Sequence, residues 1–87
     1  MVNDIKWFWS CKLKRPDTLK RHKTFETAAK RVGCHGFVYS EADQTVKQVM
    51  LMSDNTLRGF DVDKSPSLCN TGGFDMREAL RSFNIIE

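Results

Sequence analysis

The residues from Ile5 to Lys14 alternate between two sets of side chains, and this pattern constrains the fold more than any other in the chain. One set consists of Ile5, Trp7, Trp9, Cys11 and Leu13, and the other of Lys6, Phe8, Ser10, Lys12 and Lys14. A period of two that includes aromatic residues predicts a β-strand with one buried face. Proline has no backbone N–H to donate to a sheet, so the sequence Arg15-Pro16-Asp17-Thr18 is expected to end this strand in a turn.

Two later segments carry apolar residues at helical spacing. They are Phe25, Ala28, Ala29 and Val32 in the first segment, and Met76, Ala79, Leu80 and Phe83 in the second. Each set forms a single stripe along a helix, which predicts one buried face per helix. Thr24 and Asp75 can cap the two helices by accepting from free backbone N–H groups. Gly33 suits the left-handed residue that ends a helix, and Asn84 is the expected end of the second.

The segments between the helices are expected to form strands 36–40, 45–52 and 57–62, joined by turns 41–44 and 53–56. Residues 19–23 are expected to form a basic connection, and residues 64–73 (KSPSLCNTGG) a loop. The resulting β-α-β-β-β-α order predicts a single α+β domain over residues 1–87. Its architecture would be a two-layer sandwich, with a four-stranded mixed or antiparallel sheet and both helices on one face. The other face would then be uncovered and would expose Phe8, which indicates a contact surface.

Charge is distributed unevenly along the chain. Residues 1–33 carry nine Lys and Arg against three Asp and Glu, a charge of +6, while residues 34–87 carry five against eight, a charge of −3. A basic half of this kind suits an anionic partner, either an acidic protein surface or DNA or RNA. The residues predicted to bind the partner are Lys12, Lys14, Arg15, Lys20, Arg21, Lys23, Lys30, Arg31 and Phe8. Phe8 would stack on an unpaired base if the partner is a nucleic acid.

No motif in the chain specifies a catalytic chemistry, a metal or a cofactor. The three cysteines are widely spaced, which indicates free thiols rather than a disulfide framework. Two alternatives stay open: a cysteine nucleophile at Cys34 beside His35, and a metal-binding pair of carboxylates at Asp61 and Asp63. A zinc site that combines Cys34 and His35 with Cys11, His22 and Cys69 lacks the paired ligand spacing of structural zinc sites. The sequence therefore predicts a protein that is not an enzyme.

The run Thr24-Phe25-Glu26-Thr27-Ala28-Ala29-Lys30-Arg31-Val32, followed by Cys34-His35-Gly36-Phe37-Val38, resembles the helix-into-hairpin part of small phage-encoded inhibitors, including certain anti-CRISPR proteins. The resemblance covers about a fifth of the chain. It implies a binding protein that blocks a host protein or nucleoprotein by contact, with basic residues at the interface. It implies no particular target.

The sequence thus predicts a small non-catalytic binding protein that inhibits or modulates a host factor through its basic segment. The alternative is a nucleic-acid-binding protein that tolerates many sequences. Apolar runs are too short to cross a membrane, and the N-terminus lacks the features of a signal peptide. We therefore expect a cytoplasmic location, which is the host cytoplasm if a phage encodes the protein.

Overall fold

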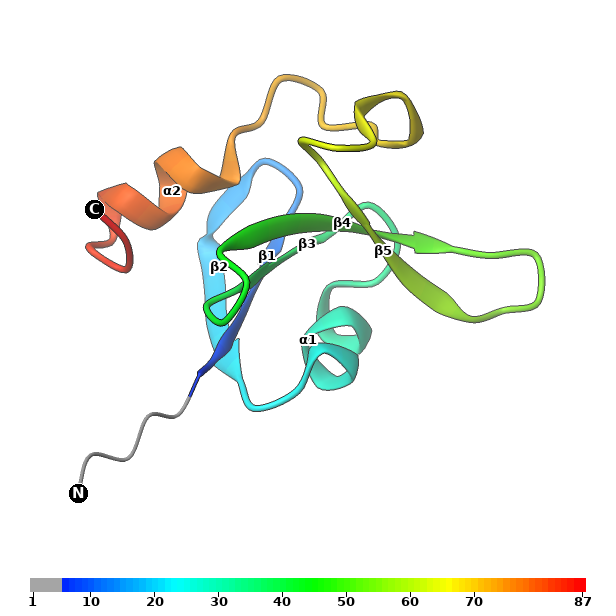
Figure 1. Cartoon of the computed structure of the whole chain (residues 1–87), viewed down its shortest axis with the longest axis horizontal. Helices are drawn as coiled ribbons and strands as arrows, with labels where there is room; N and C mark the ends of the chain where they lie inside the picture. The colour runs from blue at the N-terminus through cyan, green and yellow to red at the C-terminus, as the bar shows by residue number, and fades with distance from the viewer. Residues whose placement is uncertain (1–5) are drawn as a thin grey trace.

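The computed structural model describes residues 6–87, in which a five-stranded antiparallel sheet carries one helix on each face (Figure 1). The elements in chain order are β1 (Phe8–Lys12), β2 (Arg15–His22), α1 (Phe25–Val32), β3 (Phe37–Ser40), β4 (Thr45–Leu51), β5 (Leu57–Asp61), the 3-10 helix η1 (Pro66–Leu68) and α2 (Met76–Ser82). The strands lie in the order β2-β1-β3-β4-β5. The predicted α+β class is confirmed. Of the predicted first strand, Ile5 lies outside the described residues.

The predicted count of four strands is wrong because the supposed turn and basic connection at residues 15–23 contain a strand. Strand β2 pairs antiparallel with β1, and a tight turn at Leu13 and Lys14 joins the two. Pro16 is tolerated because β2 is the outermost strand, where a missing N–H on the outer side costs no ladder bond. The register also shifts between Ser10 and Lys12, so the first half of β2 departs from regular pairing.

Helix α1 joins β2 to β3, and β1 lies between these two strands in the sheet. Since β2 and β3 both run antiparallel to β1, they are parallel to each other. The crossover helix therefore passes over β1 and makes more contacts with β1 than with any other strand. The first strand and the strand at Phe37–Ser40 are direct antiparallel neighbours, so the helix between them in sequence does not join a parallel pair formed by these two.

The two helices cover opposite faces of the sheet, so the prediction of a two-layer sandwich with both helices on one face is wrong. Figure 1 shows α1 below the sheet and α2 above it. On the α1 face, Val38 packs with the helix alanines, and on the α2 face Phe37 packs with Leu80. Adjacent residues of β3 pack against different helices because side chains alternate between the two faces along a strand. Both faces of β3 are consequently buried, and the domain has three layers.

The helix termini follow the predicted capping residues. Thr24 accepts from the N–H of Thr27, and Asp75 accepts from the N–H groups of Arg77 and Glu78. Asn84 adopts a left-handed conformation with φ of 60°, and the N–H of the following residue, Ile85, donates to the carbonyl of Leu80. This bond turns the C-terminal residues back, so that Ile85 and Ile86 pack against the core on the α2 side.

Candidate binding surface

The predicted binding residues gather around the outer edge of the sheet. Strand β2 is an edge strand, and the pairs Ser10↔Lys20 and Trp9↔Arg21 place Lys20 on the α1 face and Arg21 on the α2 face. The basic edge is the name we give to the surface formed by β2, the adjoining turn and the end of α1, comprising Lys12, Lys14, Arg15, Lys20, Arg21, Lys23, Lys30 and Arg31. It wraps around the margin of the sheet and does not form a flat patch on one face.

The five lysines of the basic edge present their charges to solvent. All are exposed, and neither of the two ion pairs found within residues 6–87 includes one of them. They are Lys12, Lys14, Lys20, Lys23 and Lys30. Exposed lysines on an edge strand discourage pairing with another strand edge of the same charge. The same charges attract an anionic surface, so these side chains are the available part of the predicted interface.

The three arginines of the basic edge have contacts within the chain. Arg15 lies 3.7 Å from a carboxylate oxygen of Asp17, and the guanidinium of Arg21 lies 4.4 Å from the centre of the Trp7 ring. Arg31 donates from Nη1 to the carbonyl oxygen of Thr18 at 2.6 Å. Arg31 thereby ties α1 to the edge strand. We therefore assign Arg31 a structural role in addition to its charge, whereas the exposed Arg15–Asp17 pair adds little stability.

Phe8 does not lie on an uncovered face, and that part of the prediction is wrong. Its ring meets the ring of Phe25 from α1 edge-on, with 6.4 Å between centroids. The ring belongs to the cluster that includes Ala28 and Val38. The cause is the crossover described above, since α1 passes directly over β1. Phe8 is therefore poorly placed to stack on a base.

A small polar cluster under α1 was not predicted. Ser10 is fully buried, and its hydroxyl lies 2.8 Å from Nε2 of His22 and 3.3 Å from Nη1 of Arg31. Burial, followed by the positive charges of Arg31 and Lys20, lowers the pKa of His22. The arrangement is not that of an activated serine, because the hydroxyl is sealed from solvent and is already bonded to structural groups.

The lowered pKa of His22 predicts that stability falls in mildly acidic solution. The unfolded chain binds a proton at His22 near pH 6.5, whereas the folded chain binds it only at a lower pH. The stability that neutral His22 contributes to the folded chain is fully present above about pH 6.5. It is lost as the pH falls toward the lower pKa that His22 has in the folded chain. Urea unfolding at about pH 7.5 and 5.5, above the range in which most carboxylates titrate, measures the difference. The His22→Gln variant should show a smaller difference, and an equal one would contradict this assignment.

The alternative catalytic residues are held in structural roles or lie apart. Asp61 accepts from the backbone N–H groups of Asp63 and Lys64, which holds the pKa of Asp61 low, and Asp63 pairs with Arg77 at 2.8 Å. The two carboxylates thus stabilise a turn and an ion pair. Cys34 is exposed in the loop after α1, and its thiol is not part of a disulfide.

The residues considered for zinc do not converge. The Cys11 thiol is buried, its Sγ lies 3.4 Å from the carbonyl oxygens of Lys12 and Arg15, and its pKa is raised mainly by burial. Burial, followed by the charge of Asp61, also raises the pKa of the Cys69 thiol, which donates to the carbonyl of Phe60. Within residues 6–87, no three His, Cys, Asp or Glu side chains come together in a way that could hold a metal ion.

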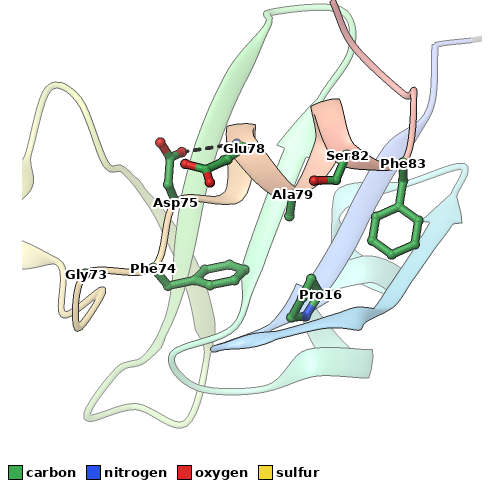
Figure 2. A pocket seen from close by; sticks show the side chains of 8 residues that line it. All are labelled: Pro16, Gly73, Phe74, Asp75, Glu78, Ala79, Ser82 and Phe83. Carbon is green, nitrogen blue, oxygen red and sulfur yellow. Dashed lines mark hydrogen bonds between the residues drawn. The ribbon is translucent and has the colours of Figure 1, made fainter.

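A shallow groove of about 310 Å³ lies between α2 and the start of β2 (Figure 2). Figure 2 shows Pro16 and Phe83 on one side of this groove and the ring of Phe74 on the other. Phe83 is 52% exposed. The carboxylate of Asp75 points away from the groove and caps the helix, so the groove offers apolar surface but no arrangement of reactive groups.

No protein-family model, curated protein or solved structure matches this chain. Neither helix in the described part of the chain reaches the length and apolar character that a membrane crossing needs.

Proposed function

We propose that this chain is a non-catalytic binding protein that inhibits or modulates a host protein or nucleoprotein in the cytoplasm through its basic edge. The observation that carries the proposal is the set of five exposed lysines along one margin of the sheet, outside both ion pairs of the described residues. The idea that a phage encodes the protein rests only on the resemblance of Thr24 to Val38 to small phage inhibitors.

An acidic protein surface fits this edge better than single-stranded nucleic acid does. Single-strand binding combines cations with aromatic rings on which bases stack. Phe8 is covered by α1, and the guanidinium of Arg21 covers the ring of Trp7. The lysines alone suit phosphates as well as carboxylates, so a nucleic-acid binder that tolerates many sequences is retained as the second candidate. Its affinity would fall steeply with salt, because binding releases condensed counterions.

Charge reversal at Lys20 and Lys23 tests the proposal while leaving the Arg21 stack and the Arg31 bonds in place. The Lys20→Glu/Lys23→Glu variant should capture the partner at least roughly tenfold less well, because complementary charges speed association and like charges oppose it. The matched control is Arg58→Glu/Lys64→Glu, which changes the net charge equally at and beyond β5, the opposite edge of the sheet. Capture from host lysate is measured with both variants, before and after nuclease treatment.

The two candidate functions predict different results. Capture that survives nuclease and is lost only in the Lys20→Glu/Lys23→Glu variant supports a protein partner at the basic edge. Capture that nuclease abolishes supports nucleic acid. If both variants capture the partner as well as the original chain does, the basic edge is not the interface.

A further inference from the structure

The main-chain bonds of β1 alternate between its two neighbours in the sheet. The N–H of Glu41, just after β3, donates to the carbonyl of Trp7, just before β1, at 3.1 Å. Trp7 is therefore bonded on the β3 side. Because the main-chain groups of successive residues in a strand point to opposite sides, Phe8 and Ser10 bond on the β2 side.

The same alternation decides which groups of β2 point away from the sheet. The partners of Phe8 and Ser10 in β2 are His22 and Lys20, which therefore bond to β1. Leu19 and Arg21 direct both their N–H and their C=O groups outward. Strand β2 is the last strand on this side of the sheet that residues 6–87 form. Its outward groups are therefore placed to pair with a strand from another molecule.

The opposite edge of the sheet, β5, is partly closed. The N–H of Val62 donates to the carbonyl of Val46 in β4, so the neighbouring residue Asp61 directs its carbonyl outward. The N–H of Ser65 donates to this carbonyl at 2.8 Å. The turn after β5 therefore occupies one end of that edge, and an added strand fits β2 better.

The side chains of β2 select the kind of strand that can be added. Lys20, Arg21 and Lys23 are exposed along the outward-facing part of the strand. A second copy of β2 would bring like charges together, whereas an acidic strand would bring opposite charges together. Leu19 is half-buried on the α2 face, and Lys20 lies on the α1 face. An added strand with acidic residues on one face and apolar residues on the other matches both.

We infer that the partner of the basic edge contributes an extended acidic segment, which pairs with residues 19–23 of β2 as a sixth strand of the sheet. This inference rests on the proposed function and adds the mode of recognition. In strand addition, main-chain hydrogen bonds supply affinity and alternate side chains supply specificity. The lysines would then select an acidic segment and reject a basic one.

A synthetic peptide of three glutamate–valine repeats, blocked at both ends, is the probe. NMR titration at constant ionic strength should show saturable shifts and slower exchange at the Leu19 and Arg21 amides. The Lys20 and His22 amides, which already bond to β1, should change less. A lysine–valine peptide of the same length should bind at least roughly tenfold less tightly, because it meets like charges.

N-methylated peptides test the main-chain bonds separately from the side chains. One form is methylated at the glutamates and the other at the valines, so each loses the N–H groups along one of its two edges. Only one form loses the N–H groups that face β2. The two forms should therefore differ at least roughly tenfold in affinity.

A proline at position 19 tests the same bonds in the protein itself. Leu19→Pro removes an outward N–H and keeps every charge of the basic edge, and proline is tolerated on an edge strand. Leu19→Ala is the matched control for the lost leucine contacts. The proline variant should bind the glutamate–valine peptide, and capture the partner from host lysate, at least roughly tenfold less well than the alanine variant.

Equal binding of the two N-methylated peptides, or unchanged exchange at the Leu19 and Arg21 amides, would overturn the inference. If capture from lysate still depends on Lys20 and Lys23 in that case, the basic edge binds its partner through side chains alone and the proposed function stands. Capture that is unchanged in the Lys20→Glu/Lys23→Glu variant would instead contradict the proposed function. The two conclusions therefore fail on different results.

Discussion

Replacement of Gln48 by leucine should lower the free energy of unfolding by about 2–4 kcal/mol, a large part of the stability of a domain of this size. Gln48 is fully buried in β4. Its Nε2 donates to the carbonyls of His35 at 3.1 Å and Asn70 at 2.7 Å, and its Oε1 accepts from the N–H of Asn70 at 2.6 Å. Leucine fills similar space but leaves these three backbone groups without their partners, and an unsatisfied buried group is costly.

Urea unfolding monitored by fluorescence measures this change, and amide exchange locates it. Exchange of the Asn70 amide should speed up by more than the lower overall stability explains. The reason is that Gln48 holds the loop between β5 and α2 against the sheet through its hydrogen bonds to Asn70. The control is Met50→Leu, two residues along the same strand face, which conserves volume and should cost less than about 1.5 kcal/mol. Equal costs for the two variants would show that packing, rather than the hydrogen bonds to the loop, explains the effect.

Replacement of Gly59 by alanine should destabilise the protein by about 1–3 kcal/mol, the usual cost of overpacking. A Cβ atom at this position would lie 2.7 Å from Cζ of Phe25 and 3.2 Å from Cβ of Lys47. Strands β4 and β5 pair regularly through Gly59, with Val49 opposite, so the glycine does not mark a bulge. The glycine instead makes room for the Phe25 ring, which lets α1 pack closely on this end of the sheet.

A double-mutant cycle with Phe25→Leu tests that explanation. Leucine at position 25 lacks the ring atoms that approach Gly59, so Gly59→Ala should cost clearly less in the Phe25→Leu background than in the original chain. Thermal or urea unfolding of the four proteins gives the coupling free energy, and values above about 0.5 kcal/mol are expected for residues in contact. Additive effects would mean that the cost of Gly59→Ala arises from something other than contact with the ring.

Local patterns predicted most individual elements correctly. The helix over Phe25–Val32 and its Thr24 cap were predicted because an apolar stripe and a capping side chain are local properties. Strand β2 was missed for two reasons: Pro16 argues against a strand, and its charged residues resemble a loop. Both features are acceptable at a sheet edge, and a sequence read one segment at a time gives no information on which strand will be outermost.

The candidate binding residues were predicted as a list, and the structure shows which of them are accessible. The lysines were expected to be exposed, and they are, because a desolvated ammonium is costly anywhere in the chain. Phe8 was expected to be exposed because both helices were placed on one face.

The amino-acid order by itself determined the local features of this protein: where helices begin and end, which side chains alternate along a strand, and where positive charge accumulates. These follow from backbone geometry, capping and periodicity within short segments. Only the tertiary structure decided that α1 crosses β1 and that the helices cover opposite faces of the sheet. The physical reason is that these outcomes depend on which strands pair and on how each helix passes over the sheet. These long-range contacts depend on the whole core, so no single segment of the sequence reveals them.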